Sequence, residues 1–264
     1  MTSTNRPTAL VTGASSGIGA CLARELARDG HDLILAARRL EPMQILAREL
    51  ESYGARATVL AADLSKVDAA ASLVRDIQER QLAIDVLVNN SGLGDSGRFD
   101  ESDPLRMKEM LLVNMAALTE LTRLLLPDML ARRRGRVMLV ASTAAFQPGP
   151  QMAVYCATKA YALSLGEAIA FELRGTGVTI TTLCPGATAT EFSSVARLDN
   201  SALFRGSVPV MSPEQVARAA YRGLKAGRRV VIPGLLNKIS AVMGRVMPRF
   251  LVLPVASSLM RPPS

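Results

Sequence analysis

The sequence predicts a doubly wound α/β fold in which a mostly seven-stranded parallel sheet carries helices on both faces. Short β-branched segments alternate with longer segments of helical periodicity along most of the 264 residues, and this alternation is typical of right-handed βαβ units. The strand segments are nearly all apolar, as expected when helices cover both faces of a parallel sheet. A glycine-rich turn follows the first strand segment directly, at the sheet edge where such folds bind ligands.

The elements can be assigned in chain order, starting with a strand at Thr8–Thr12 and a helix at Gly17–Arg28. Further apolar, β-branched strand segments are Leu33–Ala36, Ala57–Ala61, Val86–Asn89, Arg136–Ala141, Val178–Cys184 and Arg229–Ile232. Further segments of helical periodicity are Pro42–Tyr53, Val67–Arg80, Pro104–Ala131, Ala153–Arg174 and Pro213–Lys225. We expect a single domain over residues 1–264 with its core at 8–232, since a length of ~200–250 residues fits one α/β domain.

Two regions depart from this rhythm. Residues 187–212 mix turn residues with apolar ones, and a loop of this length in a compact domain is often a lid; its apolar residues are Phe192, Val195, Leu198, Leu203, Phe204, Val208 and Met211. Residues 234–264 form an apolar extension that Pro248 and Pro254 are expected to break, with Lys238, Arg245, Arg249 and Arg261 interspersed. Two interpretations of the extension stay open: it packs on its own core or on a second subunit, or it is a surface helix that touches anionic lipid.

Composition narrows the class of protein. Hydrophobic residues make up 49% and charged residues 20% of the chain, as in ordinary soluble proteins, and the net charge is +8. A basic chain can bind a nucleic acid, a membrane surface or an anionic cofactor. The one tight cationic run is Arg132-Arg133-Arg134, followed by Arg136. We expect this run to end a helix, where cations oppose the helix dipole, and we expect no nucleic-acid partner.

The cysteines and the N-terminus indicate the compartment. Cys21, Cys156 and Cys184 show neither metal-ligand spacing nor an even framework, so we expect no metal site and a reducing compartment. Cys156 adjoins Tyr155, but adjacent helical residues point to different faces. The first seven residues are polar and unlike a secretory signal, and no run approaches the ~18 uncharged residues of a membrane span. A cytoplasmic protein is therefore expected, with the inner face of a membrane as the alternative for its extension.

Tyr155 and Lys159 are the strongest candidates for chemistry. They are four residues apart in an expected helix, so their side chains share one face, and Ser142 lies thirteen residues before the tyrosine. A free tyrosine with a pKa near ~10 is a poor base at neutral pH. A nearby lysine cation is expected to lower that pKa into the range where proton transfer works. Ser142 could steady the oxygen whose proton moves.

The turn after the first strand indicates a dinucleotide site. It reads Thr12-Gly13-Ala14-Ser15-Ser16-Gly17-Ile18-Gly19 and opens a helix. Glycines allow a tight turn, and the free amides at a helix N-terminus favour a pyrophosphate. The expected cofactor contacts here are Gly13, Ser15, Ser16, Gly17, Ile18 and Gly19.

The ends of the next strands indicate which nucleotide binds. The second strand ends in Arg38 and Arg39 where an acidic residue would bind a ribose 2′-hydroxyl. Two guanidiniums can pair with a 2′-phosphate, so the chain favours NADP(H) over NAD(H), unless both arginines are merely solvated. Asp63, next to Leu64, could accept a bond from the adenine amino group or cap a helix. Asn89-Asn90-Ser91-Gly92 closes the fourth strand at the same sheet edge.

In combination these motifs resemble the short-chain dehydrogenase/reductase family, in its single-domain subgroup, over about residues 8–232. The motifs are TGASSGIG at 12–19, Asp63, NNSG at 89–92, Asn114, Ser142, YCATK at 155–159 and PGATAT at 185–190. The resemblance implies a Rossmann-like fold and a nicotinamide cofactor bound by Leu64, Asn90, Ser91, Gly92, Asn114, Tyr155 and Lys159 besides the residues above. It implies that Pro185, Gly186 and Thr188 lie against the nicotinamide.

The resemblance also implies the roles of the catalytic residues. Tyr155 is the expected general acid/base, Lys159 lowers its pKa and holds the nicotinamide ribose, Ser142 orients the substrate oxygen, and Asn114 positions a water that relays protons to Lys159. We therefore expect an NADP(H)-dependent oxidoreductase that interconverts a carbonyl and an alcohol on a small, lipophilic substrate, since the lid is apolar. The alternative is a catalytically silent, NADP-binding regulatory or scaffold protein. A homodimer or homotetramer is expected, because the fourth and fifth helices of this family commonly form subunit interfaces.

Overall fold

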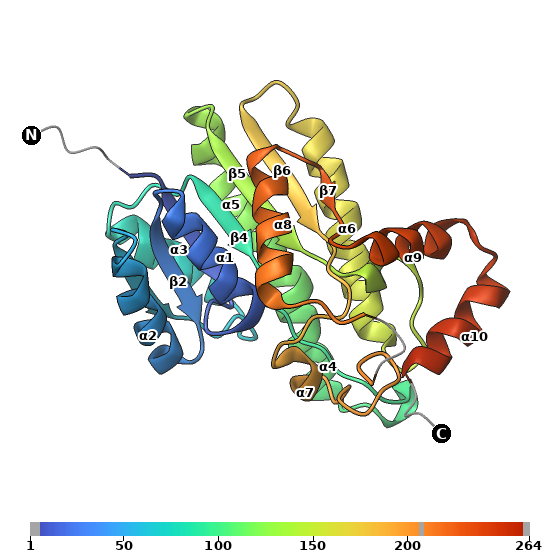
Figure 1. The fold of residues 1–264 in the computed structure, drawn as a ribbon. Coiled ribbons are helices and arrows are strands. Elements are labelled where there is room, and N and C mark those ends of the chain that lie inside the picture. Colours follow the sequence, from blue (N-terminus) through green and yellow to red (C-terminus); the bar gives the residue numbers. More distant parts are fainter. Residues whose placement is uncertain (1–5, 206–208, 261–264) are drawn as a thin grey trace, which may run out of the picture.

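Seven parallel strands form one sheet in the order β3-β2-β1-β4-β5-β6-β7 (Figure 1). The computed structural model describes residues 6–205 and 209–260. Its strands are β1 (Thr8–Thr12), β2 (Asp32–Ala37), β3 (Ala57–Ala61), β4 (Val86–Asn89), β5 (Gly135–Val140), β6 (Val178–Leu183) and β7 (Val230–Val231). Each predicted strand is present, with ends that differ by at most one residue. The predicted Rossmann-like, doubly wound α/β class is confirmed.

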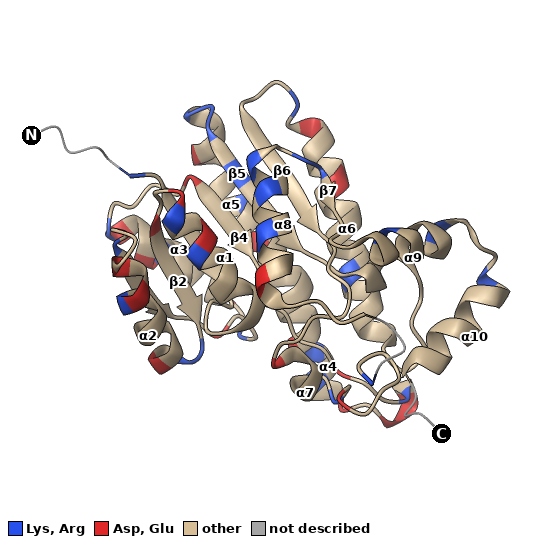
Figure 2. Ribbon diagram, viewed as in Figure 1, with Lys and Arg blue, Asp and Glu red and all other residues tan. Residues whose placement is uncertain are grey.

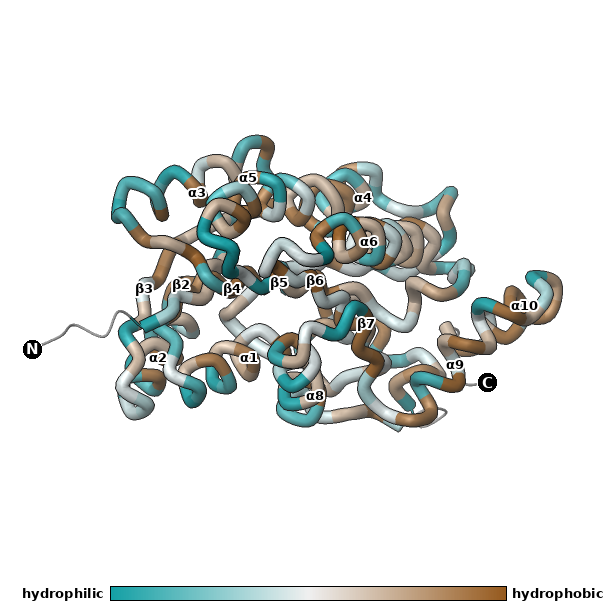
Figure 3. Tube along the Cα trace, turned by 90° about the horizontal axis from the view of Figure 1, so that it is seen from above, coloured by the Kyte–Doolittle hydropathy of each residue, from teal (hydrophilic) through white to brown (hydrophobic). Residues whose placement is uncertain are grey.

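Helices cover both faces of the sheet, as Figure 3 shows from above. One face carries α1 (Gly17–Arg28), α2 (Leu40–Glu51) and α8 (Pro213–Lys225). The other carries α3 (Ala69–Glu79), α4 (Pro104–Leu111), α5 (Leu118–Ala131) and α6 (Ala153–Glu172). The β1 strand has β2 on one side and β4 on the other, so the order of winding reverses between β1 and β4.

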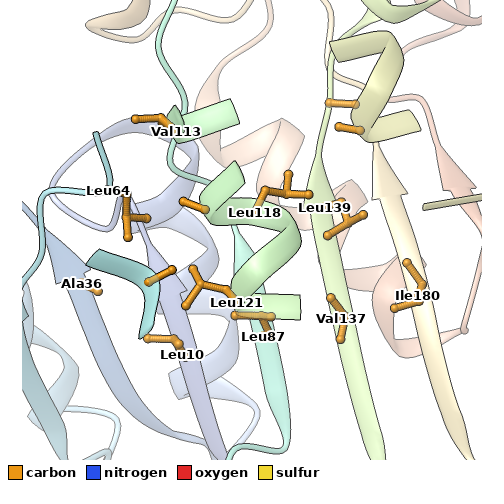
Figure 4. Packing of buried hydrophobic residues seen from close by; sticks show 14 of the residues in the cluster. Leu10, Ala36, Leu64, Leu87, Val113, Leu118, Leu121, Val137, Leu139 and Ile180 are labelled. Carbon is orange, nitrogen blue, oxygen red and sulfur yellow. The ribbon is translucent and has the colours of Figure 1, made fainter. Parts of the chain in front are cut away.

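Two apolar layers hold the helices on the sheet. In the layer shown in Figure 4, Leu10 of β1 and Leu87 of β4 face Leu118 and Leu121 of α5, and Val137 of β5 continues the layer. The opposite layer joins the other faces of the same strands to α1, α2 and α8. Because side chains alternate across a strand, a strand that is buried on both faces must be apolar throughout, which explains the continuous apolar strand segments.

The helix predicted over Pro104–Ala131 has a π-helical segment at Leu112–Ala117 between α4 and α5. Asn114 lies in this segment and is buried. The whole segment Pro104–Ala131 is long and apolar enough to cross a membrane. Its buried side chains, however, belong to the apolar layer between the sheet and its helices. The wider π turn changes which side chains face the sheet, and such turns are frequent at functional sites.

The cationic run after α5 has a structural partner. Arg132 follows the last residue of α5, as predicted, and its guanidinium lies 2.6 Å from the Asp85 carboxylate. Arg134 lies 3.1 Å from the same carboxylate, which also accepts a bond from the Thr8 amide at 3.1 Å. The run therefore ties the end of α5 to the start of β1 and β4, an interaction that the dipole argument did not predict.

Residues 187–212 form a closed excursion from the end of β6. The Met211 amide donates to the Ala187 carbonyl at 3.0 Å and the Ala189 amide donates to the Met211 carbonyl at 2.9 Å, so the two ends of the loop are joined. Between them lies the short helix α7 (Phe192–Val195). Val208, one of its predicted apolar residues, lies outside the described residues. A loop with joined ends is a compact flap that side chains of its own hold together.

The C-terminal extension folds into two helices, α9 (Leu235–Val246) and α10 (Arg249–Met260), beyond β7 (Figure 1). Pro248 separates them, as predicted. The prediction that Pro254 breaks the segment is wrong, because Pro254 lies within α10. Residue 254 is only five residues after the start of that helix, close to the first turn where a missing amide costs least. Arg261 lies outside the described residues.

Candidate active site

A crevice opens above the carboxyl ends of β1 and β4, where the winding of the sheet reverses. Folds of this kind bind ligands at that point, because the loops that leave the two strands diverge there. The glycine turn follows β1 and the Asn90-Ser91-Gly92 turn follows β4, so both predicted cofactor segments border the crevice.

The glycine turn has the geometry needed to approach a phosphate closely. Gly13 and Gly17 have positive φ angles of 63° and 56°, which other residues adopt only with strain. A Cβ at Gly19 would lie 2.3 Å from the Gly13 carbonyl oxygen, so only glycine fits there. Ser16 is the N-cap of α1 but its side chain makes no capping bond, which leaves the first amides of the helix available to an anion.

Hydrogen bonds join the turns after β1 and β4. The Thr12 hydroxyl accepts from the amides of Asn90 and Ser91, each at 3.0 Å. The Asn90 side chain donates to the carbonyls of Thr12 and Gly13 at 3.0 and 3.1 Å. The side-chain amide of Asn90 thus holds the glycine turn in place, and Asn90, a predicted cofactor contact, also lines the crevice.

The two arginines after β2 differ in their surroundings. Among the described residues, Arg38 has no carboxylate within ion-pair distance, and its charge acts on the nearby Asp63. Arg39 lies 2.5 Å from the Glu191 carboxylate of the lid and 3.3 Å from the Ser16 hydroxyl. Ser16 in turn donates to Glu191 at 3.1 Å. A carboxylate of the protein thus lies among the donors that were predicted to bind a phosphate.

Asp63 forms a turn and does not cap a helix. Its carboxylate accepts from the Ser65 amide at 3.2 Å and from the Ser65 hydroxyl at 2.7 Å, while α3 begins later, with Asp68 as its N-cap. Burial raises the pKa of the Asp63 carboxyl, but the bonds from Ser65 and the charge of Arg38 outweigh it and lower that pKa. The helix-cap interpretation is therefore wrong, and an ionised Asp63 lines the crevice.

Tyr155, Lys159 and Ser142 meet above the end of β5. The tyrosine and the lysine lie on one face of α6, as their spacing predicted, and both are buried. The lysine Nζ lies 5.7 Å from the centre of the tyrosine ring and donates to the Val140 carbonyl at 2.8 Å. Ser142 follows β5 directly, where its hydroxyl accepts from the Ala144 amide at 3.1 Å. Side chains from α6 and from the end of β5 thus converge on one point of the crevice.

Burial controls the protonation of this group. Burial raises the pKa of the Tyr155 phenol, and a hydrogen bond with Ser142 offsets the effect only in part. Burial lowers the pKa of the Lys159 ammonium to about 8. The expected lowering of the tyrosine pKa by the lysine is therefore not found in this structure, because desolvation favours the neutral form of both groups and dominates both shifts.

Asn114 is held tightly by the protein. Its carbonyl oxygen accepts from the Leu93 amide at 2.9 Å, and its amide donates to the Leu93 carbonyl at 2.9 Å and to the Thr158 hydroxyl at 3.0 Å. A Cβ at Gly92 would lie 3.3 Å from Lys159 Nζ and 3.6 Å from Asn114 Oδ1, so both polar groups approach that glycine. Asn114 thus links the π-helical segment to α6 and to the turn after β4.

A cavity of about 600 Å³ runs through the crevice. Nearly all the predicted site residues line it: Gly13, Ser15, Ser16, Gly17, Ile18, Arg38, Arg39, Asp63, Leu64, Asn90, Ser91, Gly92, Ser142, Tyr155, Lys159, Pro185, Gly186 and Thr188. Gly19 and Asn114 do not line it; Gly19 supports the glycine turn from behind, and Asn114 lies one layer deeper.

Sequence reasoning missed several residues of the cavity wall. Cys156 lines it beside Tyr155, although adjacent helical residues were expected to diverge, and burial raises the pKa of its thiol to about 11. Phe192, already assigned to the lid from the sequence, packs on Tyr155 with ring centres 5.3 Å apart, a contact that the loop pattern did not predict. The extension also contributes a wall, through Leu236, Asn237, Ser240, Ala256, Leu259 and Met260. The apolar composition of the extension was the available signal, but it does not say where the chain folds back.

Comparisons with known proteins agree with this geometry. The family model described as short chain dehydrogenase matches residues 7–201. The ketoacyl reductase HetN of Nostoc sp. is 30% identical over 254 residues, which is 94% of this chain and 88% of that protein. A short-chain dehydrogenase from Sphingobium yanoikuyae in complex with NADPH is 33% identical with a TM-score of 0.81, covering 90% of this chain and 92% of that one. The bulky-bulky ketone specific alcohol dehydrogenase from Comamonas testosteroni is 31% identical with a TM-score of 0.77, covering 92% and 94%.

Proposed function

The chain belongs to the short-chain dehydrogenase family, and from this premise we propose that it is a single-domain NADP(H)-dependent oxidoreductase that interconverts a carbonyl and an alcohol on a lipophilic substrate. The observation that carries the proposal is the convergence of Tyr155, Lys159 and Ser142 on a cavity that the glycine turn also borders. A dinucleotide that spans this cavity would bring its nicotinamide to the tyrosine.

The residues of the crevice fit a nicotinamide dinucleotide. The uncapped amides at the start of α1 suit a pyrophosphate, and Gly13 and Gly17 keep side chains out of its way. Thr188 and Gly186 line the same cavity as Tyr155. When bound, the cofactor supplies or accepts the hydride, which is its own chemistry. The protein supplies orientation and the proton.

Proton transfer is assigned to Tyr155. In the direction of reduction, the phenol donates its proton to the carbonyl oxygen of the substrate, and the Ser142 hydroxyl donates a hydrogen bond to the same oxygen. A buried phenol with a raised pKa is protonated at neutral pH, which is the form that reduction requires. Lys159 then stabilises the phenolate that forms, and Asn114 holds the Leu93 segment and α6 so that the lysine stays in place.

Preference for NADP(H) is the finer part of the proposal. The segment after β2 offers Arg38 and Arg39 and no carboxylate of its own. Arg38 is exposed and lies beside the crevice, where it can pair with a 2′-phosphate. Relatives crystallised with NADPH or NADP support the same choice.

The substrate class follows from the wall opposite Tyr155. This wall is apolar and comes from the lid and the extension, with Leu198, Leu203, Phe204, Leu259 and Met260 among its residues. Apolar walls with a few convergent polar groups suit a lipophilic ketone or alcohol. The names of the Comamonas alcohol dehydrogenase and of the Nostoc ketoacyl reductase fit this class.

The proposed assembly is a cytoplasmic homodimer or homotetramer. An apolar groove of about 630 Å³ runs along α4, α5 and α6, with Leu111, Met115, Leu124 and Tyr161 among its residues. Leu111 and Leu124 are exposed in the single chain, so pairing of two copies along this groove would remove them from water. The mass in solution, measured by light scattering, tests this part.

The test of the activity is NADPH oxidation by purified protein across a broad panel of ketones and aldehydes. We expect turnover of at least one bulky apolar ketone by the wild type. Tyr155→Phe should lose this turnover but should still bind NADPH, as measured by nicotinamide fluorescence. Absence of turnover across the panel, with Tyr155→Phe and wild type behaving alike, would contradict the proposal and favour a silent cofactor-binding protein.

A further inference from the structure

The outer surface of the C-terminal helices is apolar and cationic. The inner stripe of α9 is Asn237, Ala241 and Gly244, all buried. Asn237 donates to the Pro233 carbonyl at 2.8 Å and packs on Gly186, where an added Cβ would lie 2.3 Å from its oxygen. A Cβ at Gly244 would lie 3.1 Å from the Phe146 carbonyl oxygen. The helix is therefore seated firmly, with a defined side turned toward the site.

The side of α9 that points away from the protein is apolar. Successive residues of a helix are ~100° apart, so the positions opposite the buried stripe fall on one arc. That arc consists of Leu235, Leu236, Ile239, Val242, Met243 and Val246, and every one of them is exposed. An ordinary surface helix has the reverse arrangement, with its polar side in water.

Helix α10 continues the same surface. Val252 and Ala256 face inward, whereas Phe250, Leu251 and Val255 are exposed, and Phe250 keeps 72% of its surface in contact with water. Figure 3 shows brown, apolar colouring on both helices at the outer edge of the molecule. The two helices together expose a contiguous run of large apolar side chains, which marks an interaction site.

The charges on this surface have one sign. Residues 234–264 contain no Asp or Glu, and the last acidic residue of the chain is Glu214. Figure 2 shows blue and no red on α9 and α10. Arg245 reaches inward to Glu167 at 3.2 Å. Within residues 6–205 and 209–260, Lys238 and Arg249 have no carboxylate at ion-pair distance, so their charges remain available to an anionic partner.

We propose that α9 and α10 dock on the surface of an anionic lipid bilayer, with the exposed arc in the acyl region and Lys238 and Arg249 at the headgroups. An apolar arc with flanking cations is the pattern of helices that lie in a membrane interface. A second copy of the chain is the less favourable occupant, because a symmetric contact would bring the same unpaired cations of both copies together.

One part of this proposal, the entry of a lipophilic substrate from the bilayer, rests on the proposed function. Leu236 is 58% exposed and also lines the cavity, so the cavity opens next to the exposed arc. Ala256 and Leu259 line it from α10, and the Leu203 amide of the lid donates to the Leu259 carbonyl at 3.0 Å. The docked helices would thus place the mouth of the cavity at the lipid, from which a lipophilic substrate could enter without crossing water.

The experiment is co-sedimentation of the full chain with vesicles of phosphatidylcholine alone and of phosphatidylcholine mixed with phosphatidylglycerol. Wild type is expected to bind the mixed vesicles and to bind the neutral ones at least about tenfold more weakly. Ile239→Asp with Val246→Asp is expected to lower binding to mixed vesicles by at least about tenfold. Lys238→Gln with Arg249→Gln is expected to have a comparable effect, and added salt should mimic it.

A matched control uses the same residue types elsewhere. Ile45 of α2 is 60% exposed and Val67 is 70% exposed, against 51% for Ile239 and 69% for Val246. Ile45→Asp with Val67→Asp should therefore leave vesicle binding unchanged. Thermal unfolding of each variant verifies that it is folded.

Two results would overturn the proposal. One is no binding of wild type to the mixed vesicles. The other is equal binding of wild type and of Ile239→Asp with Val246→Asp to these vesicles; a lower mass in solution for the variant would then make the surface a contact between copies. Turnover of the ketone and aldehyde panel is measured with the same protein preparations in the absence of vesicles. Absence of turnover across the panel would contradict the proposed function alone, since vesicle binding does not depend on catalysis.

Discussion

The two ends of the cavity are built from different kinds of interaction. At the cofactor end, backbone groups set the geometry: Gly13, Gly17 and Gly19 have conformations or contacts that other residues cannot share, and Thr12 and Asn90 fix the turns to each other. At the substrate end, apolar side chains from the lid and the extension fill space, and any of several residue types would serve. The first end is therefore encoded by residue identity at fixed spacing, and the second only by apolar composition.

The comparison extends to charge. At the cofactor end the guanidinium of Arg39 is paired with Glu191. At the catalytic centre between the two ends, the buried Lys159 has no carboxylate within ion-pair distance in the part of the chain that the structure describes. Burial lowers the pKa of this lysine to about 8, so its charge at neutral pH costs folding free energy. Function thus places an unfavourable charge where the two ends of the cavity meet.

The largest effect is expected from Lys159→Met. Turnover should fall by about 10³-fold, because the phenolate of Tyr155 loses its nearby cation. The free energy of unfolding without added cofactor should rise by about 2 kcal/mol at pH 7, because a buried charge is removed. Chemical denaturation at several pH values measures this change.

The pH dependence follows from the sign of the shift. The folded pKa of Lys159, about 8, lies below its ordinary value of 10.5. Between these values the unfolded wild type binds more protons than the folded one, so wild-type stability rises with pH and the advantage of Lys159→Met shrinks. Lys225→Met, at an exposed ion pair with Asp29, is the control and should change stability little. A destabilised Lys159→Met variant at pH 7 would contradict the argument.

A second large effect is expected from Gly19→Ala, which tests the backbone character of the cofactor end. The new Cβ would lie 2.3 Å from the Gly13 carbonyl oxygen and 2.5 Å from Asn90 Nδ2. We expect a loss of about 2 kcal/mol in stability and of about 100-fold in NADPH affinity, because the turn must shift. Fluorescence titration measures the affinity.

Gly30→Ala is the matched control for this position. Gly30 has a φ of 86° and nothing within 4 Å of an added Cβ, so alanine brings backbone strain of about 1 kcal/mol without a clash. Its NADPH affinity should equal that of wild type. A Gly19→Ala variant with normal affinity would show that the turn is more tolerant than its contacts indicate.

The sequence predicted the sheet, its helices and most of the residues that border the crevice, for a physical reason. Strand and helix periodicities are local, and the glycine turn, the arginines after β2 and the Tyr155–Lys159 pair each lie within one element or its end. Because the strands are parallel, their carboxyl ends then lie at one edge of the sheet. No long-range information is needed for these features, and they were found at the expected positions.

The features that were missed depend on contacts between distant segments. The π-helical segment at Leu112–Ala117 is accompanied by bonds from Asn114 to Leu93 and Thr158, which no local pattern contains. The protonation of Tyr155 depends on its burial, and one of the residues packed on it is Phe192 of the lid. The substrate wall depends on the path by which α10 returns to the cavity, and that path follows from packing of the whole molecule.

A moderate effect is expected from Arg38→Ala, which tests how the cofactor end selects its nucleotide. NADPH affinity should fall by about tenfold or more and NADH affinity should not change, because only the 2′-phosphate meets this guanidinium. Arg39→Ala should lower NADPH affinity less, since Glu191 already neutralises Arg39. Titration of both cofactors gives the ratio.

Glu191→Gln completes this test. Removing the carboxylate frees Arg39 for the 2′-phosphate, and we expect NADPH affinity to rise about threefold, in line with the modest worth of an exposed ion pair. NADH affinity should stay constant. Tighter binding of NADH than of NADPH by wild type would contradict the assignment of both arginines, whatever the variants do.

The smallest effect is expected from Phe204→Ala, because the substrate end relies on filled space. Phe204 lines the cavity and is half-buried, so alanine should raise the KM for a bulky apolar ketone about twofold while leaving NADPH affinity unchanged. Phe171→Ala, on the exposed side of α6 against Arg174, is the matched control and should leave KM unchanged. Steady-state kinetics with a bulky and a small ketone measure the effect. A higher KM for the bulky substrate alone locates its apolar part against the lid. A kcat loss of equal size for both substrates would instead mean that the lid acts on Tyr155 through Phe192.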